Sequence, residues 1–281
     1  MRKVLHAAWN EVLYGGHLQC LGAVAILGTV AGAFGAPFPW GLPVSTYAVA
    51  YAVYVYNRLL EVSADTATNP ARTALIVAHQ RARWGAFHGS WLLATVVVLL
   101  NAALPGAIFL ATLLAFGLLY TNVFKGLTRF LPGFKTVYVA SAFSALVFLP
   151  YAFAGRPIPV ATLAPFAVWV FWNAAIMQIC LDVKDMPSDA RAGLRTIPLL
   201  LGTATTFRVL IVLTTLAALP PLLWSRGSQQ PAQVAVLAIA PLLSLFSLHG
   251  ARKGDYQAYL LESGKFICWP ALLALGRILA A

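Results

Sequence analysis

Hydrophobic residues in this chain form long continuous runs, without the alternation of apolar and polar positions that marks a half-buried strand. Runs of about 18–24 apolar residues have the length of a helix that crosses a bilayer. The pattern therefore predicts nine spans, near residues 15–35, 41–60, 86–103, 106–122, 136–154, 158–181, 204–224, 231–249 and 262–280. Residues 3–14 are expected to form a short amphipathic helix along the membrane surface and not a cleavable signal.

Composition supports the same fold class. Hydrophobic residues make up 60% of the 281 positions and charged residues 10%, whereas a soluble domain carries roughly 25% charge. A membrane β-barrel would show alternating positions. We therefore expect an all-α, polytopic membrane helical bundle of about nine transmembrane helices, forming a single domain over residues 1–281.

The basic residues predict an orientation. Of 19 Lys and Arg residues, only Arg156, Arg226 and Arg277 fall on one side of the predicted bundle. The positive-inside rule then places the other sixteen in the cytoplasm, so we expect a multi-pass protein of the cell inner membrane. The net charge of +11 belongs to loops between spans, which favours anionic lipid headgroups and an anionic substrate over nucleic acid.

Five of the eight acidic residues form two clusters, at positions 57–65 and 182–189. The first follows the second predicted span and the second follows the sixth. Because four spans separate the two clusters, both are expected on the same face of the membrane. This spacing predicts two four-helix halves plus a ninth helix, each half offering one acidic cluster.

Within each cluster the acidic side chains are spaced to share one side of a helix. A step of four residues drifts by about 40° around the helix, and steps of three and four keep side chains on one face. Pro187 is expected to end the second helix, so that the last carboxylate lies on a turn. The residues with this spacing are Asn57, Glu61 and Asp65 in the first cluster, and Asp182, Asp185 and Asp189 in the second.

Clustered carboxylates repel one another, and a divalent cation relieves that repulsion. Mg²⁺ keeps positions open for phosphate oxygens. We therefore expect two Mg²⁺ ions held by Glu61, Asp65, Asp182, Asp185 and Asp189, with Asn57 in support. The alternative is that these are ordinary loop acids paired with basic neighbours.

Basic side chains beside the clusters would bind a diphosphate, since Arg offers a planar fork and Lys a point charge. Their alternative role is to keep the loops in the cytoplasm. The residues expected to contact the diphosphate are Arg72, Lys125 and Lys184, with Arg58, Arg129, Arg191 and Arg195 behind them.

At these residues the chain resembles the UbiA superfamily of intramembrane prenyltransferases. The family motif N-x-x-x-D-x-x-x-D is similar to Asn57, Glu61 and Asp65, with Glu61 in place of an aspartate, and D-x-x-x-D is similar to Asp185 and Asp189. Flanking segments agree as well, at residues 69–72, 120–125 and 185–202.

The resemblance implies a Mg²⁺-dependent enzyme with Asn57, Glu61, Asp65, Asp185 and Asp189 as catalytic residues. It would transfer the prenyl group of a prenyl diphosphate to a hydrophobic acceptor, aromatic or lipid-like. Two alternatives stay open. A terpene cyclase of the same superfamily would ionise the donor without an acceptor. A transporter would need polar residues across the full membrane depth, and the opposite half of the bilayer is nearly free of charge.

Overall fold

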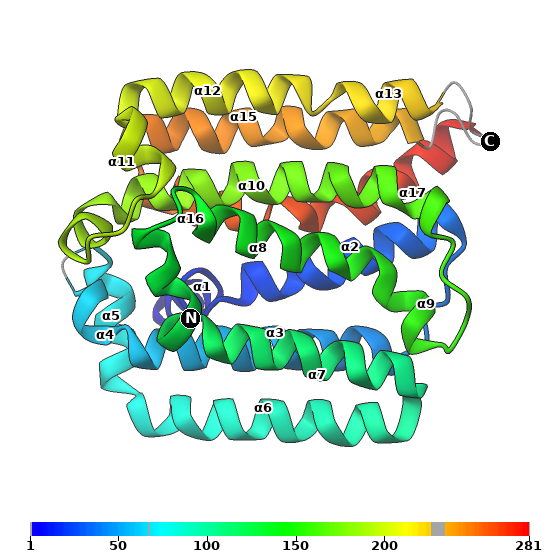
Figure 1. Cartoon of the computed structure of the whole chain (residues 1–281), viewed down its shortest axis with the longest axis horizontal. Helices are drawn as coiled ribbons and strands as arrows, with labels where there is room; N and C mark the ends of the chain where they lie inside the picture. Colours follow the sequence, from blue (N-terminus) through cyan, green and yellow to red (C-terminus); the bar gives the residue numbers. More distant parts are fainter. Residues whose placement is uncertain (1, 67, 226–233, 281) are drawn as a thin grey trace.

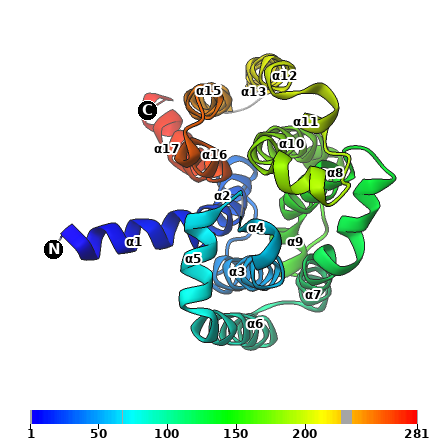
Figure 2. The same cartoon turned by 90° about the vertical axis from the view of Figure 1, so that its left-hand side faces the viewer.

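The computed structural model describes residues 2–66, 68–225 and 234–280, and within these ranges the chain forms helices and no strand. Most of the helices run side by side along one direction (Figure 1). The short helices α4 and α5 lie at one end of the bundle, which is called the site end below. Figure 2 looks at this end and shows the long helices end-on. The prediction of an all-helical bundle is confirmed.

The first half of the chain runs from the N-terminal helix to the fourth predicted span. It contains α1 (Arg2–Tyr14), α2 (His17–Phe34), α3 (Gly41–Leu60), α4 (Val62–Asp65), α5 (Pro70–Ala78), α6 (Gln80–Asn101) and α7 (Leu104–Leu119). A π-helical turn over Tyr120–Phe124 and a 3₁₀ turn over Lys125–Arg129 extend α7.

The second half begins with α8 (Phe134–Ala145), a 3₁₀ turn (Leu146–Phe148) and α9 (Leu149–Phe153). It continues with α10 (Val160–Arg191), α11 (Ile197–Leu201), α12 (Thr203–Leu216), α13 (Leu219–Ser225), a 3₁₀ turn (Val236–Ala238) and α15 (Ile239–Arg252). It ends with α16 (Tyr256–Ser263), a 3₁₀ turn (Lys265–Cys268) and α17 (Trp269–Ala280).

Helices occupy all nine predicted spans, within the described residues. Six helical segments are long and apolar enough to cross a membrane, and the bent pair formed by α16 and the segment Lys265–Ala280, with an angle of 54°, would be a seventh. Helix α3, which is 20 residues long, is not among these segments, and the apolar segment Val236–Arg252 is shorter. The chain is therefore a multi-pass membrane protein.

Helix α10 departs from expectation at its C-terminal end. Pro187 lies inside the helix, which continues to Arg191, so Asp189 is helical and the prediction of a turn is wrong. A proline removes one backbone donor. Two side-chain bonds lie beside it: the Ser188 hydroxyl donates to the Asp185 carbonyl at 2.9 Å, and Arg191 Nε donates to the Pro187 carbonyl at 3.2 Å.

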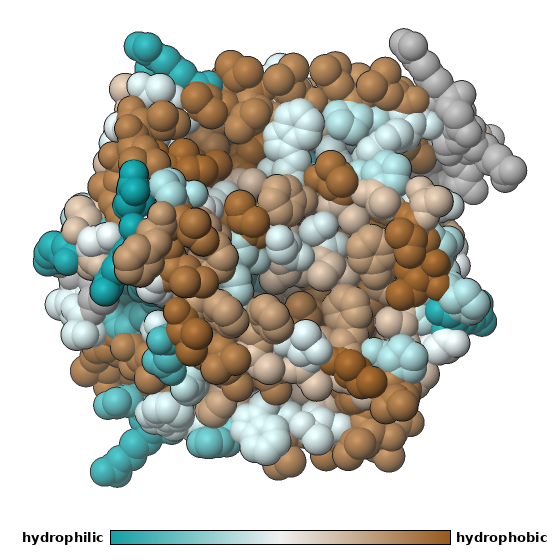
Figure 3. All heavy atoms as spheres, viewed as in Figure 1, coloured by the Kyte–Doolittle hydropathy of each residue, from teal (hydrophilic) through white to brown (hydrophobic). Residues whose placement is uncertain are grey.

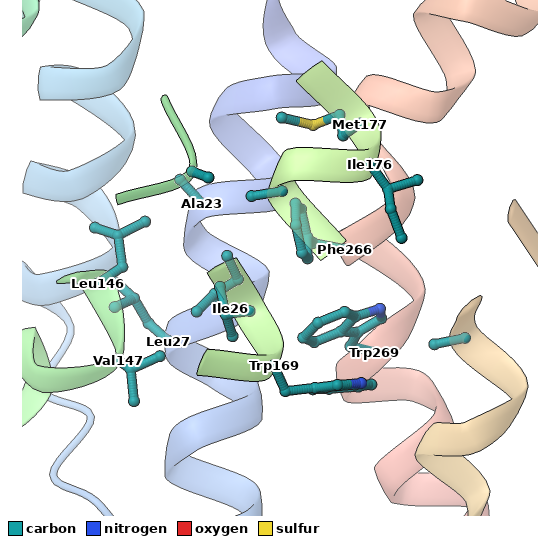
Figure 4. Close-up of a cluster of buried hydrophobic side chains, with 14 of the residues drawn as sticks. Ala23, Ile26, Leu27, Leu146, Val147, Trp169, Ile176, Met177, Phe266 and Trp269 are labelled. Atoms are coloured by element: carbon teal, nitrogen blue, oxygen red, sulfur yellow. The ribbon is translucent and has the colours of Figure 1, made fainter. Parts of the chain in front are cut away.

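Large side chains from three helical segments fill the space beside α2 (Figure 4). Trp169 on α10 stacks on Trp269 on α17, with ring centroids 4.3 Å apart. Phe266 packs edge-on against Trp269 at 4.8 Å, and Ile26 from α2 is fully buried in the same cluster. The Trp169 indole also donates to the Ala217 carbonyl at 2.7 Å, which ties α10 to the end of α12.

The outer surface is mostly apolar. Leu99 on α6 and Phe246 on α15 are 78% and 79% exposed, as expected of side chains that face lipid. Figure 3 shows brown and pale residues across most of one face, with hydrophilic residues gathered mainly over the site end. Arg156 follows α9 at the opposite end, and Arg277 donates to the Gly32 carbonyl near the C-terminus of α2. Arg226, the third basic residue predicted there, lies outside the described residues.

Candidate functional site

A cavity of about 680 Å³ runs between α2, α3, α7, α8, α10 and α16. Its body is apolar, with Val49, Leu110, Leu113, Val139 and Leu146 among the lining residues. Its polar part is at the site end. There the charged lining residues of the described chain are four cations and one carboxylate, namely Arg58, Arg72, Lys135, Lys184 and Asp185.

Arg58 organises the first acidic cluster. It lies in the last turn of α3, and its guanidinium spans two carboxylates, with Nη2 at 2.7 Å from Glu61 Oε2 and Nη1 at 2.9 Å from Asp65 Oδ2. Lys125 Nζ lies 2.5 Å from the other oxygen of Glu61, and Arg72 Nη2 lies 2.7 Å from Asp65 Oδ2. Two carboxylates therefore hold three cationic side chains at the mouth of the cavity.

The charges around Glu61 control its ionisation. Burial alone would raise the pKa of this carboxyl group, but the positive charges of Arg58 and Lys125 outweigh burial and lower the pKa to about 2. Glu61 is therefore an anion at every physiological pH, and it acts as a fixed counter-ion for both basic residues.

Asn57 joins α3 to the end of α7. Its Nδ2 donates to the Gly117 carbonyl at 3.1 Å, and its Oδ1 accepts from the Thr121 hydroxyl at 2.9 Å. Gly117 permits this close approach, since a Cβ there would lie 2.4 Å from a methyl group of Val53. The π-helical turn that follows carries the chain from Tyr120 to Lys125, which brings the Lys125 ammonium to Glu61.

The second acidic cluster lies along α10 and holds two lysines. Lys135 Nζ, from the first turn of α8, lies 2.7 Å from Asp182 Oδ1 and 3.3 Å from Asp189 Oδ2. Lys184 Nζ lies 2.6 Å from Asp185 Oδ1. Asp182 is fully buried, and its Oδ2 has no hydrogen-bond partner. The three carboxylates thus share only two cations.

Asn69 connects the two clusters. It is fully buried between α4 and α5, four residues after Asp65. Its Nδ2 donates to Asp185 Oδ1 at 3.1 Å, and its Oδ1 accepts from Lys184 Nζ at 2.7 Å and from the Tyr256 hydroxyl of α16. Three segments distant in sequence therefore meet at one amide.

Not every predicted site residue reaches the cavity. Arg129, Arg191 and Arg195 are exposed and do not line it. Arg129 Nε donates to the Ala192 carbonyl at 3.1 Å, which ties the loop after α7 to the end of α10. Lys125 also lies off the lining, but it contacts the site through Glu61.

Sequence reasoning missed Lys135, Asn69 and Tyr256 as site residues. Lys135 appears in the sequence only as one of several loop cations, and its pairing across α8 and α10 needs the tertiary structure. Asn69 had a signal, because it begins the Asn69–Arg72 segment that resembles a family loop. Tyr256 had none, because it lies 187 residues from its partner Asn69.

The donor chemistry suits Mg²⁺, which prefers hard oxygen ligands, because a carboxylate, Asp185, lines the polar end of the cavity. In the described chain no three His, Cys, Asp or Glu residues are grouped to hold a metal ion by themselves. Mg²⁺ commonly binds through one or two carboxylates together with substrate phosphates. Asp185, which lines the cavity, and the unpartnered Oδ2 of Asp182 are oxygen donors that fit this mode.

Comparison with known proteins identifies related folds. An Aeropyrum pernix UbiA homologue without ligand is 14% identical, with a TM-score of 0.68 over 94% of this chain and 98% of that one. A UbiA homologue from Archaeoglobus fulgidus bound to GPP and Mg²⁺ is 14% identical, with a TM-score of 0.64 over 94% and 99% of the two chains. A digeranylgeranylglyceryl phosphate synthase structure is also 14% identical, with a TM-score of 0.55 over 99% and 98%.

These likenesses establish the fold. No curated protein matches the sequence. The sequence model of the UbiA prenyltransferase family, however, matches residues 21–259, which include both acidic clusters and most of the residues that line the cavity. The chain therefore belongs to the UbiA prenyltransferase family.

Proposed function

We propose that this protein is an intramembrane prenyltransferase that ionises a prenyl diphosphate with Mg²⁺ and transfers the prenyl group to a hydrophobic acceptor. The observation that carries the proposal is the shape and charge of one cavity, which has four cations at its mouth and hydrocarbon along its body. A diphosphate attached to an apolar tail has the matching distribution. The homologues solved with GPP and Mg²⁺, and with DMAPP and Mg²⁺, support this assignment.

The basic residues hold the diphosphate as its C–O bond breaks. A guanidinium has five N–H donors, and the contacts with Glu61 and Asp65 use only some of them, so Arg58 and Arg72 keep N–H groups for phosphate oxygens. Preorganised cations stabilise the negative charge that grows on the leaving group. The carboxylates behind them fix their positions before the substrate arrives. When bound, Mg²⁺ supplies further positive charge to the same oxygens.

The apolar body protects the allylic cation that remains. It excludes water, which would otherwise capture the cation. Tyr120 and Tyr138, whose ring centroids lie 5.2 Å apart, both line the cavity, and their aromatic faces can stabilise a positive charge. An aromatic or lipid-like acceptor would enter from the bilayer. We place the site end at the cytoplasmic face of the cell inner membrane, following the positive-inside rule.

Activity in lipid nanodiscs tests this function. The purified chain would be incubated with dimethylallyl, geranyl and geranylgeranyl diphosphate, with Mg²⁺ or with EDTA, and diphosphate release would be measured. We expect release that requires Mg²⁺ and is abolished in Asp185→Asn. Release that persists in EDTA would contradict the proposal. A cyclic product formed without acceptor would assign the chain to the terpene cyclases instead.

Charge-removal variants test the clamp. Arg72→Ala should slow diphosphate release, because it removes about 2–4 kcal/mol of transition-state stabilisation, as loss of other electrostatic donors does. Arg72→Lys should recover part of the rate, because it keeps the charge and loses the fork. Lys253, exposed in the loop between α15 and α16, offers a matched control, and Lys253→Ala should leave the rate unchanged. Equal rates in all variants would show that the basic residues serve only topology.

A further inference from the structure

The two acidic clusters differ in net charge. In the first, Glu61 and Asp65 face Arg58, Arg72 and Lys125, which leaves a formal charge of +1. In the second, three aspartates face Lys135 and Lys184, which leaves a formal charge of −1. A divalent cation is therefore repelled by the first cluster and attracted by the second.

Three of the four carboxylate oxygens of the first cluster are also occupied. Glu61 Oε1 contacts Lys125 at 2.5 Å and Glu61 Oε2 contacts Arg58 at 2.7 Å, so neither oxygen is open to a metal ion. Asp65 Oδ2 accepts from two arginines. Glu61 and Asp65 are both buried, and an arginine side chain cannot lose its proton to make room.

The cavity wall shows the same asymmetry. Arg58 and Arg72 line the cavity, while Glu61 and Asp65 lie behind them. On the other side Asp185 lines the cavity together with Lys135 and Lys184. A bound diphosphate therefore meets only guanidinium groups on the side of the first cluster, and a carboxylate beside two ammonium groups on the side of the second.

We propose that Arg58 takes the place of one of the two metal ions expected from the sequence, so that the enzyme binds a single Mg²⁺, at Asp185. The guanidinium bridges Glu61 and Asp65 and presents its remaining N–H groups to the diphosphate. The single Mg²⁺ enters with the diphosphate on the side of the second cluster. This inference rests on the proposed function.

Counting bound metal tests the proposal without relying on turnover. The full chain in detergent would be dialysed to equilibrium against Mn²⁺, which replaces Mg²⁺. Inorganic diphosphate would be present as the probe in both compartments, and the Mn²⁺ bound per chain would be measured. We expect one Mn²⁺ per chain. Its electron paramagnetic resonance spectrum should be that of an isolated ion. Two bound ions with a spin-coupled spectrum would overturn the proposal while leaving the proposed function intact.

Carboxamide variants then locate the ion. Asp185→Asn should lose the bound Mn²⁺, whereas Asp65→Asn and Glu61→Gln should keep it, with size-exclusion profiles confirming that each variant is folded. Loss of the ion in Asp65→Asn and its retention in Asp185→Asn would overturn the assignment. If a variant fails to fold, the number of Mn²⁺ ions bound by the parent chain still tests the proposal. A parent chain that binds neither Mn²⁺ nor diphosphate would instead contradict the proposed function.

Arg58 itself is tested by diphosphate affinity in EDTA. If its guanidinium acts as a built-in cation, the parent chain should bind inorganic diphosphate without metal, and Arg58→Gln should weaken that binding roughly ten- to a hundredfold. Arg58→Lys should fall between the two. Metal-free affinity that is unchanged in Arg58→Gln would show that Arg58 serves only its two carboxylates.

Discussion

Asn69 donates a 3.1 Å hydrogen bond to Asp185, a residue 116 positions away in the sequence. The same amide accepts from Lys184 and from Tyr256, and it does not line the cavity. Asn69 is therefore a positioning residue. It holds the cavity-facing carboxylate of the second cluster in register with the segment that carries Asp65 and Arg72.

Replacing Asn69 tests this role. Asn69→Ala leaves Lys184, Asp185 and Tyr256 without a shared partner, and each buried group left unsatisfied costs about 1–3 kcal/mol. We expect slower diphosphate release and weaker Mn²⁺ binding in this variant. Tyr256→Phe, which removes only one donor, should lose less.

The two variants separate positioning from general stability. If Asn69→Ala melts at a lower temperature but binds Mn²⁺ as tightly as the parent, the amide has a structural role only. Equal losses in Asn69→Ala and Tyr256→Phe would indicate that the link to α16, not the orientation of Asp185, governs the site.

One further buried ion pair lies apart from the two acidic clusters. Lys265 Nζ is 2.7 Å from Glu262 Oε1 at the bend between α16 and α17, and the two side chains are 3% and 1% exposed. Ser247 of α15 donates to the other oxygen of Glu262. Removing one partner of a buried pair leaves an uncompensated charge, at a cost of about 3–5 kcal/mol.

Lys265→Met should therefore lower the melting temperature of the detergent-solubilised protein strongly. The double variant Lys265→Met with Glu262→Leu should recover much of the loss, since replacing both charges by apolar groups is often neutral. A double variant that is no more stable than Lys265→Met would contradict this explanation.

Glu11 provides a pH-dependent contact between α1 and the bundle. Arg83 on α6 binds both of its oxygens, at 2.7 and 2.5 Å, and His17 lies 3.3 Å from Oε1. The hydrogen bond from His17, opposed by partial burial and helped by Arg83, lowers the pKa of Glu11 to about 2. A lowered pKa stabilises the fold above the ordinary value of 4.5, and the contribution is lost as the pH falls toward 2.

Thermal melting of the parent and Glu11→Gln should show this dependence. The difference in melting temperature should be constant above about pH 5 and should shrink between pH 4.5 and 2. Arg83→Gln should show the same window. A difference that persists unchanged down to pH 2 would indicate that the carboxylate charge does not hold α1.

The sequence predicts the helical fold and both acidic clusters because each depends on local spacing. Apolar runs give the spans, and steps of three and four residues place Asp182, Asp185 and Asp189 along α10. The sequence also identifies the family, because the spacing of the family motifs is retained in the chain.

Partners across helices could not be predicted in this way. No periodicity tells which of several basic residues reaches Asp182, and only the packing of α8 on α10 selects Lys135. Arg58 was expected to contact a diphosphate, yet its bridge between Glu61 and Asp65 depends on the turn from α3 to α4. Pro187 was expected to end α10 because proline has no backbone N–H, but the helix continues through it to Arg191.

The cation-lined mouth of the cavity is proposed to bind the diphosphate of a prenyl donor while the apolar body holds its tail. A structure of the protein with a non-ionisable geranyl thiolodiphosphate and Mg²⁺ tests this most directly. We predict the diphosphate within hydrogen-bond distance of Arg58, Arg72 and Lys184, with the tail beside Leu110 and Leu146. Diphosphate bound instead at the exposed Arg129 or Arg191, with the cavity free of the tail, would contradict the account.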